Sequence, residues 1–279
     1  MFEAEVNTPD LMSSDEIKVG LGTKILGREI ISYAQTSSTN DIALDLAAGG
    51  MPEGTLILTE SQTEGRGRRK RKWLSPMGTG ILASLILRPS IMAHEAHCVT
   101  LISAAAVAQA IRCMTQLPAL IKWPNDVIIN DRKVSGILTE MRTERGWVNF
   151  LVVGIGVTVN IPRSRFPAEI MDSATSLSVE LGHKISRIAL LQEILRQLEC
   201  RYVKMEERKI DVLMAEWKSL SATMGRQVRV GLSNRIVSGH ALDMDETGAL
   251  LVRTDTGQIQ RITADMDFRF QSREQRAES

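Results

Sequence analysis

The sequence is poor in aromatic residues and carries almost no excess charge of either sign. Only 4% of its 279 residues are Phe, Trp or Tyr, and 34 Lys and Arg residues stand against 33 Asp and Glu residues. A platform of stacked aromatics for single-stranded nucleic acid is therefore disfavoured, as is a polyelectrolyte contact over the whole molecule. The apolar share of 43% is typical of a globular chain, and the length predicts about two domains.

Cysteine and long apolar runs are also scarce. Cys98, Cys113 and Cys200 lie far apart among apolar neighbours, so we predict reduced core residues and neither a disulfide frame nor a zinc site. No uncharged apolar run reaches the ~18 residues of a membrane span. The acidic start, MFEAEVNTPD, is unlike a secretory signal. We expect a cytoplasmic protein without a membrane or nucleic-acid partner.

Several common catalytic motifs are missing or incomplete. The sequence has no G-x-S-x-G elbow and no Walker loop, which argues against an acyl hydrolase and a P-loop kinase. Gly154-Ile155-Gly156 lacks the third glycine of a dinucleotide-binding fingerprint. His94-x-x-His97-Cys98 has the spacing of helical metal ligands, but no further Cys or His cluster completes a site.

The first two thirds of the chain alternate between β-rich and helical patterns. Residues 1–27 are predicted to form a polar arm, partly disordered or briefly helical, which is too short for a helix-turn-helix domain. Residues 28–222 are predicted to form an α+β domain with a mixed or antiparallel sheet. Its expected strands are Glu29–Tyr33, Thr55–Ser61, Ile81–Leu87, Leu120–Trp123, Val127–Ile129, Val134–Met141 and Trp147–Val159. Its expected helices are 38–48, Ala93–Gln116, Ser186–Glu207 and Ile210–Leu220.

The pattern changes after Gly225. Four short β-rich segments, Gln227–Val230, Arg235–Ala241, Gly248–Arg253 and Gln258–Thr263, are separated by turn residues such as Leu232-Ser233-Asn234. They predict a small antiparallel β-barrel over residues 223–271, followed by a polar tail at 272–279.

The loop after the second expected strand is unusually basic. It reads Gly65-Arg66-Gly67-Arg68-Arg69-Lys70-Arg71-Lys72-Trp73 in a chain that is otherwise neutral. Glycines let backbone N–H groups approach an anion, and guanidinium groups bind phosphate or carboxylate with two hydrogen bonds. This combination favours a polyphosphate ligand. A nucleic-acid patch or a solvated loop is the alternative, since basic runs match by chance.

Three further segments carry polar groups at element ends. Lys122-Trp123-Pro124-Asn125-Asp126 lies between two expected strands and is followed by Asn130, Lys133 and Gly136, so Asn125 or Asp126 could contact a nucleotide or Mg²⁺. An ordinary polar turn is the alternative. Ser37-Ser38-Thr39-Asn40 begins a helix and could hold a small polar group, or could be a plain cap. Asn160 follows the Gly154-Ile155-Gly156 segment.

In this order and at these spacings, the segments resemble the biotin–protein ligases. The resemblance extends over about residues 28–270, and the paired GRGRR and KWPND segments are its most specific part. It implies a class II synthetase-like ligase domain followed by a small SH3-like β-barrel, in a form without an N-terminal DNA-binding domain, as a monomer or homodimer. It implies that biotin reacts with ATP, with Mg²⁺, to give biotinyl-5′-AMP, and that biotin then passes to a lysine of a biotin carboxyl carrier protein.

The resemblance also implies a role for each matching residue. Lys133 and Arg68 are the implied catalytic residues. The implied contacts to biotin and adenylate are Ser37, Ser38, Thr39, Gln62, Arg66, Gly67, Arg68, Lys133 and Gly136. The implied contacts to the nucleotide are Arg71, Trp73, Asn125, Asp126 and Asn160, with Asp126 as a contact to Mg²⁺.

One residue departs from the family pattern, because Lys70 stands where the family has a third glycine. A side chain there restricts positive φ and adds charge, so the ordering of the loop is expected to differ. Two other functions compete with biotin ligation. A lipoate–protein ligase shares the fold and the acyl-adenylate chemistry, and a silent biotin sensor or a nucleic-acid-binding module would use the basic loop without catalysis.

Overall fold

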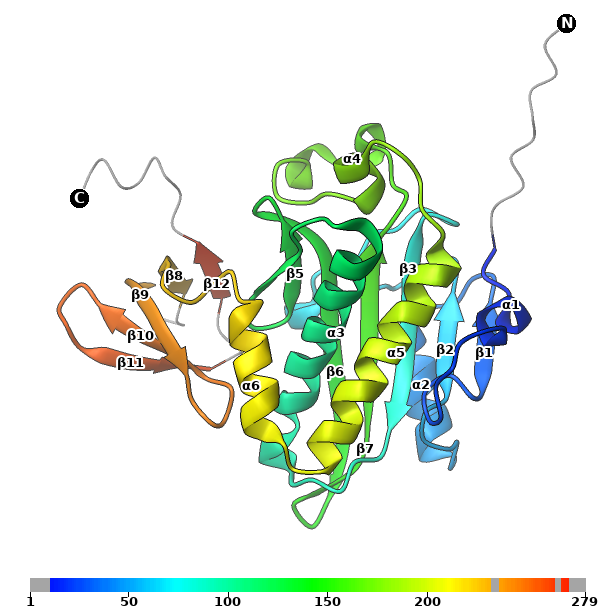
Figure 1. Ribbon diagram of the computed structural model, residues 1–279, viewed down its shortest axis with the longest axis horizontal. Helices are drawn as coiled ribbons and strands as arrows, with labels where there is room; N and C mark the ends of the chain where they lie inside the picture. Colours follow the sequence, from blue (N-terminus) through cyan, green and yellow to red (C-terminus); the bar gives the residue numbers. More distant parts are fainter. Residues whose placement is uncertain (1–10, 232–235, 264–266, 271–279) are drawn as a thin grey trace, which may run out of the picture.

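The structure, a computed structural model, describes residues 11–231, 236–263 and 267–270 (Figure 1), without the side chains of residues 70 and 267–270. Residues 1–10 of the expected arm, the expected turn at 232–234 and the expected tail at 272–279 lie outside the described residues.

A mixed seven-stranded sheet forms the body of the protein. Its strand order is β1-β2-β3-β7-β6-β5-β4, and only β1 and β2 run parallel. The prediction of a mixed sheet with helices is therefore confirmed. The strands are β1 (Ile30–Tyr33), β2 (Leu56–Thr59), β3 (Gly80–Leu87), β4 (Leu120–Lys122), β5 (Asp126–Ile129), β6 (Arg132–Glu144) and β7 (Trp147–Thr158).

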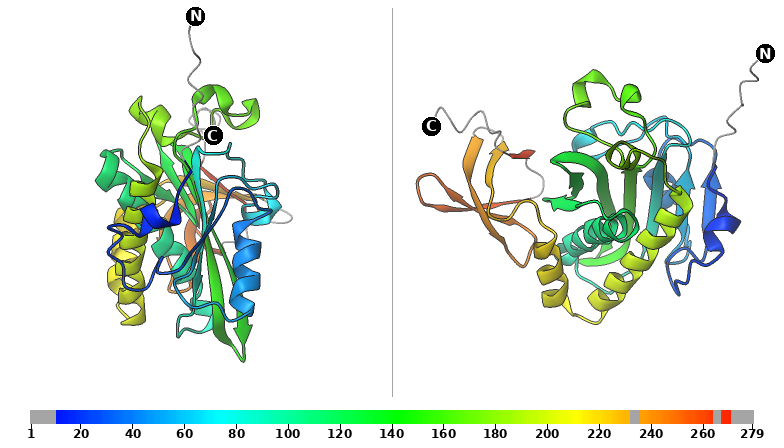
Figure 2. Two further views of the ribbon diagram at one scale, coloured as in Figure 1. Left: turned by 90° about the vertical axis from the view of Figure 1, so that its right-hand side faces the viewer. Right: turned by 45° about the horizontal axis from the view of Figure 1, so that its top comes forward.

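Helices cover both faces of this sheet, as the side view in Figure 2 shows. Helix α2 (Thr39–Ala48) lies on one face over a small cluster that includes Ile57, Ile86 and Phe150. Helices α3 (His97–Thr115), α5 (Arg187–Glu206) and α6 (Ile210–Ser219) lie on the other face over the main core. Alternation of side chains along each strand sends successive residues to these two cores.

The sequence signals for helix ends mostly hold. The Ser186 hydroxyl accepts a hydrogen bond from the Ala189 N–H (3.2 Å) and caps α5.

Within the described residues, one stretch, 93–115, is long and apolar enough to cross a membrane, and 67% of its most apolar window is buried inside the protein. That surface is thus already covered by the core of this domain.

The turn between β5 and β6 explains how Lys133 is positioned. Asn130 and Asp131 both have positive φ, 51° and 60°, the backbone twist of a two-residue hairpin that Asn and Asp tolerate well. The hairpin places Lys133 one residue into β6, beside β5 and opposite Ile128.

Residues 11–27 take the briefly helical alternative of the predicted arm, and they are packed on the domain. They contain the short helix α1 (Ser14–Lys18), and Met12, Ile17, Leu21 and Leu26 are buried in the main core. The Glu199 carboxylate of α5 accepts three backbone N–H bonds from residues 24–26. The four apolar side chains anchor this polar stretch to the core. Their irregular spacing gave no periodic pattern from which the packing could be predicted.

A second, antiparallel sheet follows the helices, with strand order β11-β10-β9-β8-β12. Its strands are β8 (Gln227–Gly231), β9 (Ile236–Met244), β10 (Leu250–Thr254), β11 (Ile259–Ile262) and β12 (Asp267–Phe270). The fifth strand was not predicted. Among the described residues no pairing joins β11 to β12, so closure into a barrel remains a prediction. The Trp123 indole N–H donates to the Gly248 carbonyl (3.0 Å) and links the two sheets.

Candidate functional site

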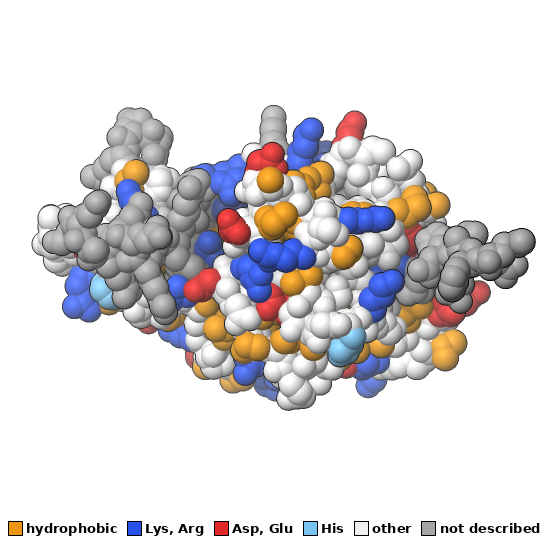
Figure 3. Space-filling view, turned by 90° about the horizontal axis from the view of Figure 1, so that it is seen from above, with side chains coloured by type: hydrophobic (Ala, Val, Ile, Leu, Met, Phe, Trp, Pro, Cys, Tyr) orange, Lys and Arg blue, Asp and Glu red, His pale blue; other side chains and the backbone are white. Residues whose placement is uncertain are grey.

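A cavity of about 590 Å³ opens over the β3, β6 and β7 strands of the main sheet, beside the basic loop. Predicted site residues from distant parts of the chain meet in it. They are Ser38, Thr39, Gln62, Arg66, Gly67, Arg68, Arg71, Trp73, Asn125, Asp126, Lys133 and Gly136. Seen from above (Figure 3), Lys and Arg side chains lie among hydrophobic ones in the middle of this face of the molecule.

One end of the cavity is built from neutral hydrogen-bonding groups at the N-terminus of α2. The Gln62 amide oxygen accepts hydrogen bonds from the Thr39 backbone N–H (2.8 Å) and hydroxyl (3.1 Å). The Ser84 and Thr39 hydroxyl oxygens lie 2.8 Å apart. Ser38 occupies the cap position but makes no capping hydrogen bond. Gln62 therefore takes over the cap, and Ser38 lines the cavity.

Close packing beneath this neutral end explains one glycine of the Gly154-Ile155-Gly156 segment. The Asn40 side chain is buried, accepting from Ser84 (2.6 Å) and donating to the Glu140 carboxylate (2.7 Å). A Cβ at Gly154 would lie 2.2 Å from the Asn40 amide oxygen. Only glycine fits this position without moving Asn40.

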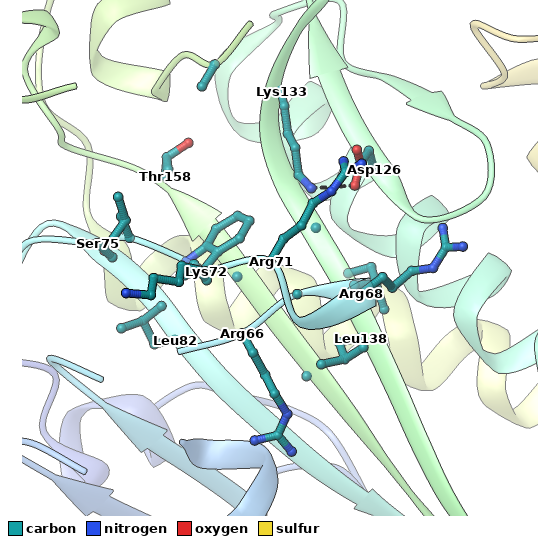
Figure 4. Close-up of a pocket in the computed structure, with 18 of the residues that line it drawn as sticks. Arg66, Arg68, Arg71, Lys72, Ser75, Leu82, Asp126, Lys133, Leu138 and Thr158 are labelled. Carbon is teal, nitrogen blue, oxygen red and sulfur yellow. Dashed lines mark ion pairs between the residues drawn. The ribbon is translucent and has the colours of Figure 1, made fainter. Parts of the chain in front are cut away.

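The other end of the cavity is charged (Figure 4). The Lys133 ammonium lies 2.6 Å from the Asp126 carboxylate and 5.5 Å from the centre of the Trp73 ring. The Lys133 backbone donates to the Ser173 carbonyl and accepts from the Thr175 N–H, both at 2.8 Å. Burial lowers the pKa of the Lys122 ammonium. This end therefore concentrates cations beside few protein anions, as an anionic ligand requires.

Trp73 fills the floor between the two ends. A Cβ at Gly156 would lie 2.6 Å from its indole ring, and a Cβ at Gly136 would lie 3.2 Å from it. The indole nitrogen is buried and, within the described residues, has no hydrogen-bond partner. Because neither glycine has a side chain, the indole can lie directly against the sheet.

Arg66 lines the cavity and is also paired with carboxylates. Its guanidinium turns away from Lys133, toward α2 (Figure 4), where both terminal nitrogens lie 2.5 Å from the Asp41 carboxylate. Glu140 lies 3.1 Å away on the other side. The hydrogen bonds to Asp41 raise the pKa of this guanidinium. Arg66 therefore ties the loop to α2 at the edge of the cavity.

Arg68 is held from the other side. It donates to the Asn125 amide oxygen (2.9 Å), and the Asn125 amide donates to the Ile137 carbonyl of β6 (2.6 Å). Within the loop, Gly67 N–H donates to the Arg71 carbonyl (2.7 Å), and the residue with positive φ is Arg69 (58°). The prediction about the Lys70 side chain lies outside what is described.

Two predicted residues lie outside the cavity lining. The Ser37 carbonyl accepts from the Glu64 N–H (2.9 Å) and supports the loop from behind. The Asn160 amide donates to the Ile185 carbonyl (2.9 Å) and accepts from the Ile185 N–H (3.1 Å). Asn160 thus binds backbone just before α5, and its predicted contact to the nucleotide stays a prediction.

One wall of the cavity was missed by the sequence analysis. The segment between β7 and α4 (Leu177–Leu181) lines it with Ile161, Arg165, Phe166, Pro167, Ile170, Ser173 and Ala174. It contains only two short 3₁₀ turns, 163–165 and 168–170. Its paired prolines and arginines, IPRSRFP, were the available signal, but they have no periodicity from which an element could be predicted.

The described residues do not form a ready metal site. No group of three or more His, Cys, Asp or Glu side chains gathers there, and Asp126 is paired with Lys133. His97 uses Nδ1 to bind the His94 carbonyl (2.8 Å) instead of presenting a ligand pair. Mg²⁺ is commonly held by one or two carboxylates together with substrate phosphates, so the donor set here does not fit a resident ion.

Comparison with known proteins places this fold in a class of protein ligases. Residues 32–158 match the model of the Biotin/lipoate A/B protein ligase family, and residues 223–269 match the Biotin protein ligase C terminal domain. A solved structure of the biotin protein ligase from Aquifex aeolicus in complex with biotin and ATP superposes with a TM-score of 0.75 at 29% identity, covering 88% of this chain and 100% of that one.

Sequence relatives narrow this class. The bifunctional ligase/repressor BirA of Bacillus subtilis is 39% identical over 263 residues, covering 94% of this chain and 81% of that protein. A biotin acetyl-CoA-carboxylase ligase of Mycobacterium tuberculosis is 32% identical over 230 residues, covering 80% and 82%. The chain belongs to the biotin–protein ligase branch of the biotin/lipoate ligase family. That it lacks a DNA-binding domain stays a prediction.

Proposed function

We propose that the chain is an ATP-dependent biotin–protein ligase, with the two substrates at the two ends of the cavity. A biotin carboxylate oxygen attacks the α-phosphorus of ATP, the bond to the bridging oxygen breaks, and biotinyl-5′-AMP and pyrophosphate form. A lysine ε-amine of a carrier protein then attacks the biotinyl carbonyl carbon, loses a proton, and releases AMP. The observation that supports this proposal most strongly is that one cavity has a neutral hydrogen-bonding end and a cationic end around Lys133.

Biotin is assigned to the neutral end. Its ureido ring offers one carbonyl acceptor and two N–H donors, and the Ser38 and Thr39 hydroxyls and the Gln62 amide can exchange such bonds. The α2 N-terminus adds backbone N–H groups with positive potential beside the ring oxygen. Gly154 leaves room for the Asn40 side chain beneath this end, and Gly156 leaves room for the Trp73 indole, which would form the apolar floor under the bicyclic ring and the valeryl chain.

ATP is assigned to the charged end. Lys133 is placed where a carboxylate and an α-phosphate would meet, so it neutralises the charge that develops on the phosphoryl oxygens. Arg68 and Asn125 would cover the adenylate, and Arg71 would reach the other phosphates. Since the donor set does not fit a resident ion, any Mg²⁺ is expected to arrive with ATP, held by phosphate oxygens and water.

The acceptor is proposed to be a biotin carboxyl carrier domain of acetyl-CoA carboxylase, which the name of the mycobacterial relative supports. We also propose that residues 28–222 form the ligase domain, with 11–27 packed on it, and that residues 223–271 form a separate C-terminal domain.

ATP–pyrophosphate exchange by the purified chain with biotin, lipoate or no acid tests the first half-reaction. We expect exchange with biotin alone. Exchange with lipoate would assign the chain to the sister enzymes, and binding of biotin without exchange would leave a sensor. Transfer of labelled biotin to a purified carrier domain, compared with the same domain lacking its acceptor lysine, tests the second half-reaction.

A further inference from the structure

The basic loop has a stem as well as a tip, and the stem lies away from the cavity. Residues 61–79 connect β2 to β3, whose last registered pair is Thr59 with Leu82. Glu60 and Gly80 are therefore the residues from which the loop departs and to which it returns. Any change in the spacing of these two residues shifts Gln62 at one end of the cavity and Arg68 at the other.

A single guanidinium nitrogen joins the two sides of this stem. Arg187, the first residue of α5, has no exposed surface, and its Nη1 donates to the Glu60 carboxylate (2.6 Å) and to the Gly80 carbonyl (3.0 Å). Glu60 is only 5% exposed, and its second oxygen accepts from the Met12 N–H (2.6 Å). Within the described residues, Nε and Nη2 of Arg187 are buried without a partner.

Asn160 fixes the backbone from which the Arg187 side chain extends. Its backbone N–H donates to the carbonyl of Thr79 (2.7 Å), the last residue of the loop. Its side chain holds the backbone of Ile185 through both its donor and its acceptor, two residues before Arg187. The start of α5 is thereby joined to the loop stem at Thr79, Gly80 and Glu60.

We propose that Glu60, Asn160 and Arg187, here called the stem clamp, are positioning residues that hold the basic loop in the conformation seen here, with Arg68 on Asn125. The expected effect on adenylate dissociation rests on the proposed function. The expected effect on the conformation of the loop does not. None of the three lines the cavity, so they act through Gln62 and Arg68.

Stability alone does not account for a buried ion pair at this place. Replacing such a pair by apolar residues of similar volume is often neutral or stabilising, because the desolvation of both charges is avoided. A fixed, directional contact to a carbonyl on the opposite strand is what an apolar pair cannot supply. The clamp therefore has a positional effect that can be separated from its effect on stability.

The decisive variant is the double substitution Glu60→Met with Arg187→Leu, which removes both charges together. Three measurements are made on the full chain: the melting temperature, the rate of trypsin cleavage after Arg and Lys within residues 66–72, and the dissociation rate of biotinyl-5′-AMP formed on the enzyme. The matched control is Glu95→Met with Arg208→Leu, an ion pair of 2.7 Å that is more exposed than the stem clamp and lies outside the cavity lining.

We expect the double variant to melt near the wild-type temperature. We expect its loop to be cleaved about tenfold faster and its adenylate to dissociate about ten- to a hundredfold faster, because small displacements have large effects at the reacting atoms. The control should match the wild type in both rates. Wild-type cleavage and dissociation in a stable double variant would overturn the proposal.

Two single variants decide the matter if the double variant fails to fold. Asn160→Ala should also expose the loop to trypsin, and cleavage at the wild-type rate would overturn the proposal. Arg187→Lys should keep cleavage slow, because one nitrogen makes both contacts and a lysine ammonium has donors for both; fast cleavage in this variant would contradict the proposal. Trypsin cleavage needs neither biotin nor ATP, so failure of the proposed function, seen as absent biotin-dependent exchange by the wild type, is distinguished from failure of the clamp.

Discussion

The two ends of the cavity differ in how their polar groups are partnered. At the neutral end, Thr39, Gln62, Ser84 and Asn40 hydrogen-bond one another, and the arrangement is complete without ligand. At the charged end, Lys133 is paired with a carboxylate that an incoming phosphate must compete with. The comparison shows one half that is preorganised and one half that must exchange partners on binding.

This difference has energetic consequences. A preorganised set of neutral groups loses little conformational freedom when a ligand binds, so its contribution depends chiefly on fit. A cation that exchanges one anion for another gains only the difference between two ion pairs, but it stabilises charge that develops during the reaction. Substitutions at the neutral end should therefore act on binding, and those at the charged end on the rate of adenylation.

The largest expected effect is that of Lys133→Ala, which tests the charged end directly. Loss of the ammonium beside the reacting phosphate should lower biotin-dependent pyrophosphate exchange by about 10³-fold, with a smaller change in biotin binding. Lys209→Ala, which removes an exposed lysine paired with Glu207, is the control. A Lys133→Ala enzyme that is defective only in the KM for biotin would contradict the division between the two ends.

Gly154→Ala tests the neutral end by shape alone. The added Cβ must displace the Asn40 side chain, which Ser84 and Glu140 hold, and with it the adjoining Thr39. We expect the KM for biotin to rise about 10²-fold while the KM for ATP stays near that of the wild type. Gly49→Ala, whose Cβ meets only ordinary contacts at 3.5 Å, is the matched control. Equal increases in both KM values would argue that the two ends are not separate.

Arg68→Gly tests the boundary between the two ends. Without the hydrogen bond to Asn125, the loop should open more often and release biotinyl-5′-AMP before transfer. We expect labelling of bystander proteins such as albumin to increase about tenfold, with exchange largely retained. Arg145→Gly, in the exposed turn after β6, controls for the substitution itself. Unchanged selectivity toward bystanders would count against this role.

The parts of the site that could be predicted from sequence are those with local signals. The Ser38 cap position, the hairpin at Asn130-Asp131 and the two strands that end in glycine-rich or polar runs all follow from backbone preferences within a few residues. The charged loop was found by composition. The direction of Arg66 was not predictable, because it depends on Asp41 and Glu140, which lie 25 and 74 residues away along the chain.

The misses have a common physical origin. The wall at 161–174 and the segment 11–27 have no periodic pattern, and both are held by contacts to distant backbone, such as Ser173 to Lys133 and residues 24–26 to Glu199. The contact of Asn160 to the nucleotide, which the resemblance implies, stays a prediction, and its hydrogen bonds to the backbone of Ile185 were not foreseen. Tertiary hydrogen bonds of this kind leave no signal in a single sequence.

The smallest expected effect is a pH dependence at Lys122, which sharpens the contrast between the ends. Burial lowers the pKa of its ammonium below the ordinary value of 10.5, so the charge is lost at a lower pH than for an exposed lysine. Between the lowered pKa and 10.5 the unfolded chain binds more protons, so this group makes the protein more stable as pH rises through that window.

ATP affinity should change in the opposite direction, because the cavity loses a cation. We expect the KM for ATP to rise a few-fold toward alkaline pH in the wild type but not in Lys122→Arg, since a guanidinium stays charged. The KM for biotin should stay level in both, and a parallel alkaline rise in both KM values would show that Lys122 acts on the whole cavity.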